Sequence, residues 1–147
     1  MSKAVLMAVI AALVFGVLTL SAEARDTRLR LPLADALGNA NAKAQLSEDV
    51  KLFFGKQAHP KPAQSFGSFQ TNKKTNFFNK SDKEACEWAF LSAMITLQGR
   101  ARQLGGNAVV NIKSIYKNGN FESDTEYECG AGAFVGGVAF SGEVVKL

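Results

Sequence analysis

The chain has 147 residues, of which 47% are hydrophobic and 20% are charged, and its formal net charge is +4 at pH 7. This small positive excess excludes a polycation that binds its partners by bulk charge alone. After the export signal described next, one domain of about 120 residues would bury roughly two thirds of its unfolded surface, enough for a core of its own.

Residues 1–24 are expected to form a signal peptide. Lys3 precedes an apolar run over residues 4–20, and Ala22-Glu23-Ala24 has the small-x-small pattern that signal peptidase cleaves. Cleavage after Ala24 would remove one basic and one acidic residue and leave a single mature domain, residues 25–147, with the same net charge. The expected location is periplasmic or secreted.

A retained membrane anchor is the alternative. The apolar run is slightly shorter than the roughly 20 residues of a spanning helix, and the basic Arg25, Arg28 and Arg30 that follow it prefer the cytoplasmic side. We favour a cleaved signal because the processing pattern is present. Ser21, not a cysteine, stands at the end of the run, so no lipid anchor is expected.

The first part of the mature chain predicts two strands after a poorly defined segment, residues 25–46. Apolar residues alternate with others over residues 50–55, which indicates a strand, and a loop with His59, Pro60 and Pro62 follows over residues 57–64. Residues 65–70 are expected to form the second strand, with a bulge at Gly67.

A long helix is the best-defined element. Ser81 and Glu84 have the spacing of a capping box, and Gly105-Gly106 supplies the left-handed backbone that ends a helix. The helical repeat places one apolar stripe toward the expected sheet. Its members are Cys86, Phe90, Ala93, Leu97, Ala101 and Leu104.

The opposite side of this helix carries a second apolar stripe. It consists of Trp88, Leu91 and Ile95, so the first half of the helix should not face only water. Either the N-terminal segment covers these residues, or another protein does. They form the candidate interaction face.

A β-hairpin is predicted after the helix. Asn118-Gly119 is a strong signal for a type I′ turn, which needs positive φ at both central residues. Pairing outward from this turn gives an inner face with the pairs Tyr116–Phe121, Ile112–Thr125, Val110–Tyr127 and Ala108–Cys129. It gives a mostly polar, solvent-facing side with the pairs Lys113–Asp124, Asn111–Glu126 and Val109–Glu128.

The two cysteines are expected to form one structural disulfide. Cys86 falls on the inner stripe of the helix and Cys129 on the inner face of the hairpin, so two independent periodicities place both sulfurs in one layer. No Cys-x-x-Cys pair is present, and two cysteines with His59 do not supply four zinc ligands. The sequence therefore predicts an α+β fold in which one long helix packs on a small, mainly antiparallel sheet, stapled by one disulfide, with no cofactor or metal.

No motif indicates catalysis. Gly130-x-Gly132 and Gly136-Gly137 precede an alternating strand pattern, not the helix that a nucleotide loop requires, and no Walker-type sequence occurs. These glycines indicate a long strand that bends or approaches the helix closely. The single histidine, His59, has no evident catalytic companions. A non-enzymatic protein is expected, and an unrecognised periplasmic enzyme is the alternative.

Lysines cluster in the first half of the mature chain with phenylalanines among them, a composition that can bind nucleic acid or an anionic surface. We favour a solvated lysine-rich surface over core phenylalanines, because the excess charge is small and spread out. The residues are Lys51, Lys56, Lys61, Lys73, Lys74, Lys80 and Lys83, with Phe66, Phe69, Phe77 and Phe78.

Three segments carry a resemblance to a known group of proteins. ACEWAFLSA at 85–93, LGGNAVVNI at 104–112 and YECGAGA at 127–133 closely resemble small exported bacterial proteins that often carry the label "excinuclease ATPase subunit". The nucleotide-binding motifs that this label implies are missing. More distantly, a helix that ends in Leu-Gly-Gly-Asn-Ala-Val-Val and leads to a hairpin is similar to the YbjQ-type and RcsF-like fold.

The resemblance implies an α+β fold with a helix on a small antiparallel sheet, and no functional residue carries over. RcsF-like proteins use disulfides and protein contacts to report envelope damage, whereas this chain has neither a lipid-attachment cysteine nor a second cysteine pair. The expected function is binding of an envelope protein or another envelope component, through the second helical stripe or the basic region.

Overall fold

The computed structural model describes residues 25–147, so the expected signal peptide, residues 1–24, lies outside the described residues. No helix within residues 25–147 is long and apolar enough to cross a membrane. The elements in chain order are β1 (Thr27–Pro32), α1 (Leu33–Gly38), α2 (Ala40–Gln45), β2 (Lys51–Phe54), β3 (Gln64–Asn76), α3 (Asp82–Leu104), β4 (Ala108–Ser114), the 3₁₀ turn η1 (Tyr116–Asn118), β5 (Glu126–Ala131) and β6 (Val135–Lys146).

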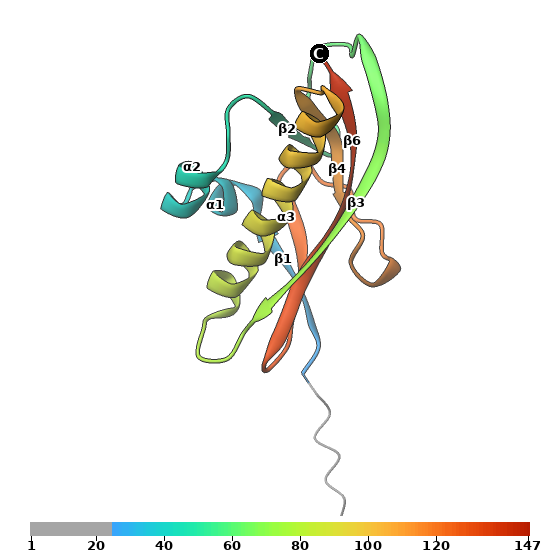
Figure 1. The fold of residues 1–147 in the computed structure, drawn as a ribbon. Coiled ribbons are helices and arrows are strands. Elements are labelled where there is room, and N and C mark those ends of the chain that lie inside the picture. The colour runs from blue at the N-terminus through green and yellow to red at the C-terminus, as the bar shows by residue number, and fades with distance from the viewer. Residues whose placement is uncertain (1–24) are drawn as a thin grey trace, which may run out of the picture.

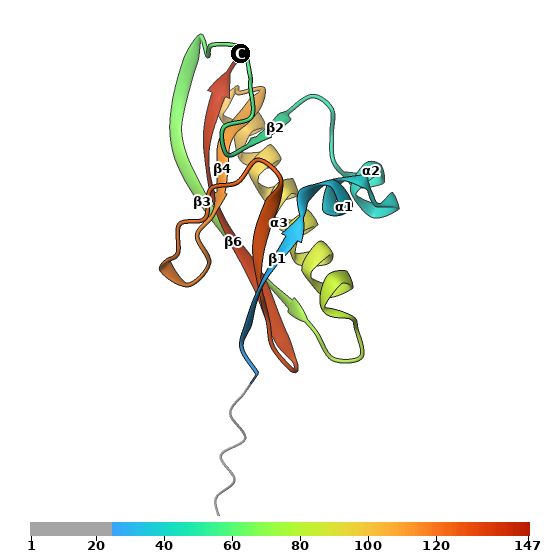
Figure 2. The ribbon, with the colours of Figure 1, turned by 180° about the vertical axis from the view of Figure 1, so that it is seen from behind.

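The long helix α3 packs on one face of a curled six-stranded sheet, as Figures 1 and 2 show from opposite sides. The strand order is β1-β5-β6-β4-β2, and β3 pairs with the other edge of β6. All pairs are antiparallel except β2 with β4. The predicted α+β fold with a mainly antiparallel sheet is therefore confirmed.

The C-terminal strand β6 organises the sheet. One edge of β6 pairs with β3 along nearly its whole length, from Gln64–Lys146 to Asn76–Val135. Its other edge is shared between β4 and β5. β3 runs to Asn76, beyond the residues 65–70 predicted for it, whereas the predicted bulge is present at Gly67, where φ is +95° and the register shifts.

The ends of α3 follow the sequence signals. The Ser81 hydroxyl accepts a hydrogen bond from the Glu84 backbone N–H at 3.1 Å, which satisfies one free donor of the first turn. Gly105 has a φ of +84°, and the Gly106 N–H donates to the Ala101 carbonyl at 2.8 Å. These are the left-handed residue and the long hydrogen bond of a Schellman motif.

The core lies between α3 and the sheet. The predicted inner stripe is buried from Cys86 to Ala101, and Leu104 is only half-buried. Phe90 of α3 is the centre of an aromatic cluster, with its ring centroid 4.7 Å from Tyr127, 5.7 Å from Phe140 and 5.8 Å from Phe54. Such pairs add to the stability that area burial alone provides.

The predicted hairpin between β4 and β5 is wrong. Backbone pairing between the two segments is limited to an isolated bridge between Ser114 and Phe121. Cys129 lies opposite Leu29 of β1, and Ala108 lies opposite Val145 of β6. In the structure β4 pairs with β6 and β5 pairs with β1. Pairing with strands that are distant in sequence thus replaces the local hairpin.

A bulge in β4 explains why the predicted faces of this strand also fail. Asn111 has a φ of +48°, and the register with β6 shifts between Val110 and Lys113. Val109 and Ile112 therefore both join the main core. On the other face a second cluster forms from Ala108, Val110 and Val145, with Phe53 and Leu147 packed against it.

Of the two β5 residues predicted on the polar, solvent-facing side of the hairpin, Glu126 is exposed but Glu128 is buried. Glu128 is 2% exposed, and its carboxylate lies 3.6 Å from the guanidinium of Arg30. Its backbone N–H donates to the Ser114 hydroxyl at 2.9 Å. The segment between β4 and β5 thus folds over this side of the sheet and covers it.

Residues 25–46 pack on the domain. β1 pairs with β5 from Thr27–Ala131 to Pro32–Glu126. Leu33 and Ala36 of α1 and Ala42 of α2 are buried. Asn39 joins the two short helices, because its side chain accepts a hydrogen bond from the Ala42 N–H at 2.9 Å. The segment that was poorly defined in sequence is therefore a strand and a helical cover beside α3.

Candidate functional site

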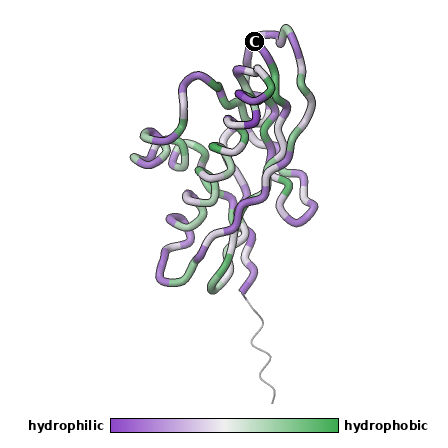
Figure 3. The backbone as a smooth tube through the Cα atoms, in the orientation of Figure 1, coloured by the Kyte–Doolittle hydropathy of each residue, from purple (hydrophilic) through white to green (hydrophobic). Residues whose placement is uncertain are grey.

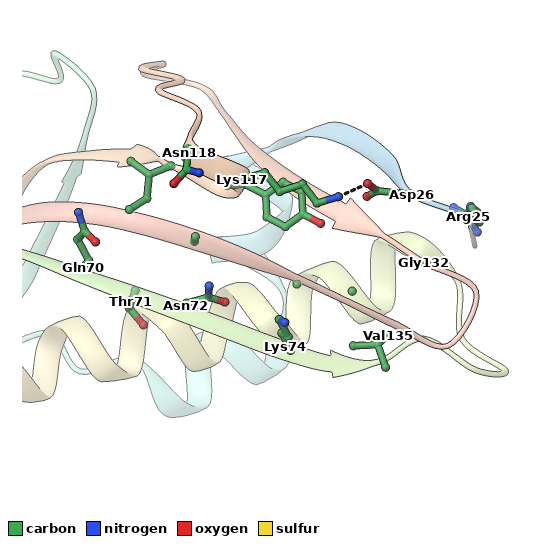
Figure 4. Close-up of a pocket in the computed structure, with 15 residues that line it drawn as sticks. Arg25, Asp26, Gln70, Thr71, Asn72, Lys74, Lys117, Asn118, Gly132 and Val135 are labelled. Atoms are coloured by element: carbon green, nitrogen blue, oxygen red, sulfur yellow. Dashed lines mark hydrogen bonds and ion pairs between the residues drawn. The ribbon is translucent and has the colours of Figure 1, made fainter. Parts of the chain in front are cut away.

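A groove of about 760 Å³ lies on the face of the sheet that α3 leaves open (Figure 4). We call it the open-face groove. Its floor comes from β6, one wall from β3 and the other wall from η1 and its neighbour Ile115. Arg25, Gly132 and Val135 lie at one end, and Gln70 and Asn118 lie toward the other.

The floor of the open-face groove has almost no side chains. Gly136, Gly137 and Ala139 of β6 form it. A Cβ atom built on Gly137 would lie 2.1 Å from the Lys73 carbonyl oxygen, and one on Gly136 would lie 2.2 Å from the Gly130 carbonyl oxygen. Glycine therefore lets three strands approach closely and leaves the backbone accessible from above.

The β3 wall presents polar side chains. Gln70, Asn72 and Lys74 alternate with Thr71 and Lys73, so they share the open face. Thr71 points the opposite way, toward α3, and is 6% exposed (Figure 4). The wall thus offers two amides, which both donate and accept hydrogen bonds, and one ammonium group.

The opposite wall is built by a tight turn. Lys117 and Asn118 have φ values of +48° and +57°, and the Gly119 N–H donates to the Tyr116 carbonyl at 3.0 Å. The turn with two left-handed residues is therefore real, but it lies one position earlier than the predicted Asn118-Gly119 turn. The Tyr116 ring rests on Gly130, where an added Cβ would lie 1.9 Å from the phenol oxygen.

The charges of the groove are mostly cationic. Lys117 pairs with Asp26, and this hydrogen bond lowers the pKa of the Asp26 carboxyl and raises the pKa of the Lys117 ammonium. Arg25 pairs with Asp82 at the start of α3. Lys74 has no ion pair within the described part of the chain, so its charge is available to a ligand.

The predicted disulfide is present. The Cys86 and Cys129 sulfurs are 2.10 Å apart, and both residues are fully buried in the main core. The bond joins α3 to β5, on the side of the sheet opposite the open-face groove. It is therefore a structural link and does not line the candidate site.

The candidate interaction face is only partly exposed. Leu91 is 2% exposed, whereas Trp88 and Ile95 are 39% and 38% exposed. Leu91 and Trp88 border a small hollow of about 190 Å³ together with Asn39 and Asn41, next to the short helices α1 and α2. The N-terminal segment thus shields one of the three residues, and an interaction through the other two stays a prediction.

The Lys/Phe-rich region does not form one surface. Phe66 and Phe69 pack against the main core, Phe77 is buried, and Phe78 alone of the four is exposed. Lys56 approaches Glu122 and Lys83 pairs with Asp35, so these lysines belong to separate local clusters. His59 is remote from the groove and packs against the Phe53 ring with a centroid distance of 5.3 Å.

The titratable side chains that line the open-face groove belong to Arg25, Asp26, Lys74, Tyr116 and Lys117. No group of three or more His, Cys, Asp and Glu side chains within residues 25–147 is placed to hold a metal ion.

The sequence did not indicate the open-face groove. Asn72 and Lys74 of its β3 wall lie beyond residue 70, where the second strand was predicted to end. The sequence signal that could have revealed this wall is the alternation of polar side chains at Gln70, Asn72 and Lys74, which is typical of a strand with one polar face. Comparison with protein-family models, curated proteins and solved structures found no match to this chain.

Proposed function

We propose that the chain is a non-enzymatic binding domain of the bacterial envelope and that its open-face groove binds an acidic saccharide. The observation that supports this most is the convergence of amide and ammonium groups from β3 and η1 above a glycine floor. These residues belong to a regular strand and a tight turn, so their backbone positions are set before a ligand arrives.

The ligand class follows from the donors and acceptors in the groove. The amides of Gln70, Asn72 and Asn118 both donate and accept hydrogen bonds, as sugar hydroxyls do. The unpaired ammonium of Lys74 suits a carboxylate or another acid group on the same ligand. The floor of Gly136, Gly137 and Ala139 carries almost no side chains, so a sugar ring can approach the sheet backbone closely.

The compartment follows from the disulfide. A buried bond between Cys86 and Cys129 indicates an oxidising environment outside the cytoplasm. The export signal predicted over residues 1–24 supports the periplasm, where an exported domain would meet the saccharides of the envelope. The proposed function is therefore the binding of an acidic saccharide in the bacterial envelope.

Calorimetric titration with a galacturonic acid hexamer tests the proposal. Lys74→Gln should weaken binding by about ten-fold, the effect of losing one charge-assisted hydrogen bond. Lys61→Gln is the matched control, because Lys61 is an exposed lysine outside the groove. A neutral maltose-based hexamer should bind the native chain more weakly than the acidic one.

Equal affinity of the Lys74 and Lys61 variants for the acidic hexamer would contradict the proposal, as would equal affinity of the native chain for both hexamers. The alternatives from sequence stay predictions: an envelope-protein partner at Trp88 and Ile95, nucleic-acid binding, and an unrecognised periplasmic enzyme. An electrophoretic shift with single-stranded DNA would separate the nucleic-acid alternative from the saccharide.

A further inference from the structure

One end of the molecule displays an apolar tip. Its residues are Phe78 in the loop between β3 and α3, and Phe134 and Val135 at the turn between β5 and β6. They are 54%, 65% and 58% exposed, the highest values among large hydrophobic side chains of residues 25–147. The turn between β5 and β6 is coloured hydrophobic in Figure 3.

The apolar tip is held in place by the fold. The Phe78 and Phe134 rings stack with centroids 5.7 Å apart and an interplanar angle of 19°. Beneath them the Phe77 N–H donates to the Phe134 carbonyl at 2.7 Å, and the Phe77 side chain is 3% exposed. One hydrogen bond and one buried ring thus join the two loops, so the exposed rings belong to an ordered surface.

Basic residues surround the apolar tip. Lys80 is exposed and its ammonium donates to the Asn76 carbonyl at 3.1 Å. Lys74 lies on the same end of β3, two positions before Asn76, which pairs with Val135. Neither lysine forms an ion pair within residues 25–147. Asp26 and Asp82 at this end are paired with Lys117 and Arg25, and Glu84 in the first turn of α3 is a carboxylate without an ion pair among residues 25–147.

The N-terminal end of the described chain lies at the same end of the molecule. A Cβ built on Gly132, in the turn between β5 and β6, would lie 3.4 Å from the Arg25 carbonyl oxygen. The residue that follows the apolar run of residues 4–20 and its processing pattern is therefore next to the tip. If the apolar run of residues 4–20 is retained, it would enter a membrane at this end of the domain. If the chain is cleaved after Ala24, the new α-amino group of Arg25 would add a positive charge at this end.

We propose that this end of the domain rests on a membrane surface that contains anionic lipid. Phe78, Phe134 and Val135 lie in the head-group layer, and Lys80 contacts lipid phosphates. Aromatic rings are favoured at this depth, and nearby lysines attract anionic lipids. The apolar tip and its charges suffice for this contact, which does not depend on a saccharide in the groove.

Quenching of tryptophan by brominated lipid tests this orientation in the full chain. The native Trp88 is replaced by phenylalanine, and a single tryptophan is placed at the tip with Phe134→Trp or, as a second probe, Phe78→Trp. The matched control is Phe53→Trp, because Phe53 lies beside Leu147 at the other end of β6. Each variant is mixed with vesicles of phosphatidylethanolamine and brominated phosphatidylglycerol.

The tip tryptophans should lose intensity and shift to shorter wavelength, and the emission of the Phe53→Trp control should do neither. High salt, or brominated phosphatidylcholine in place of the anionic lipid, should weaken the effect at the tip. Equal quenching at both ends, or quenching that ignores salt and lipid charge, would overturn the proposal. So would unquenched tip tryptophans in a chain that elutes as a dimer, which would assign the tip to a second copy.

Discussion

Two buried hydroxyl groups have no hydrogen-bond partner among residues 25–147: those of Tyr127 and Thr71. Tyr127 is 1% exposed, and its ring packs against Phe90 of α3. Burial, with a smaller effect of Glu87 and Asp35, raises the pKa of the Tyr127 phenol above its ordinary value. A buried unpaired hydroxyl lowers stability because its hydration is lost without replacement.

Tyr127→Phe should therefore raise the free energy of unfolding by about 1 kcal/mol, and Thr71→Val should act in the same direction. Urea denaturation measures both. Tyr116→Phe is the control, because Tyr116 lies at the groove and is only half-buried. A loss of stability in Tyr127→Phe would show that its hydroxyl is paired after all.

The raised pKa of Tyr127 also predicts a pH dependence. The folded state keeps the Tyr127 phenol neutral, whereas the unfolded chain lets it ionise above a pH of about 10. The free energy of unfolding is therefore unaffected by this group below that pH and falls as the pH rises above it. The native chain should thus lose more stability than Tyr127→Phe between neutral pH and strongly alkaline pH. Parallel alkaline titrations monitored by circular dichroism give the difference.

Asp49 predicts a pH dependence on the acid side. Arg102 donates two hydrogen bonds to its carboxylate, at 2.9 and 3.0 Å, and the Ser47 hydroxyl donates another, which together lower the pKa of Asp49 to about 2. A lowered folded pKa gives stability that is present above the unfolded value near 4 and is lost as pH falls toward 2.

The native chain should therefore lose stability relative to Asp49→Asn between pH of about 4 and 2. Urea denaturation at a series of pH values measures the two curves. Because the pair is solvent-exposed, the effect should shrink in high salt. Parallel curves for the two chains would show that Asp49 and Arg102 do not interact in solution.

At the scale of elements, two close contacts decide the shape of the open sheet face. The Asn111 bulge rotates β4, and the Asn111 amide donates to the Gly55 carbonyl at 3.0 Å. Gly130 lets the Tyr116 ring lie flat on β5. Neither contact follows from local alternation, because each depends on which distant backbone arrives beside the strand.

Gly130→Ala should lower the free energy of unfolding by about 1 to 3 kcal/mol and displace η1, because the new methyl group would overlap the Tyr116 phenol. Gly38→Ala is the matched control, since nothing lies within 4 Å of a Cβ at Gly38. Thermal unfolding gives the stabilities.

Adding Tyr116→Ala to Gly130→Ala should recover part of the loss, because the overlapping ring is removed. A Gly130 variant as stable as the native chain would contradict the close packing of η1 on β5. The same two substitutions should also change the shape of the open-face groove, because Tyr116, Lys117 and Asn118 form one of its walls.

At the scale of the whole molecule, the Cys86–Cys129 bond connects the helix layer to the sheet layer. The two cysteines are 43 positions apart in sequence. Cys86→Ala with Cys129→Ala should lower the free energy of unfolding by about 4 kcal/mol, because the unfolded chain regains the freedom of the closed loop. Urea denaturation of both chains measures the difference.

Reduction of the native chain in urea should move its unfolding midpoint to that of the double variant, and the double variant should not respond to reductant. A native chain whose stability does not change on reduction would show that the sheet and helix hold together without the covalent link. The oxidising compartment would then no longer be needed for folding.

The sequence alone determined the features that depend on neighbours along the chain. The caps of α3, its buried stripe and the strand pattern of β5 follow from local hydrogen bonding and side-chain repeats. The disulfide was predictable for the same reason: the alternation of Tyr127, Cys129 and Ala131 places the sulfur in the core whichever strand pairs with β5.

Tertiary structure decided the partners of the strands and, with them, the candidate site. An isolated hairpin would pair β4 with β5, but β6 and β1 occupy the edges that it needs, and a local pattern does not reveal that competition. The open-face groove and the apolar tip are made by segments far apart in sequence, such as Lys74 with Lys117 and Phe78 with Phe134. Their side chains are visible in the sequence, but their proximity is created by long-range pairing along β6.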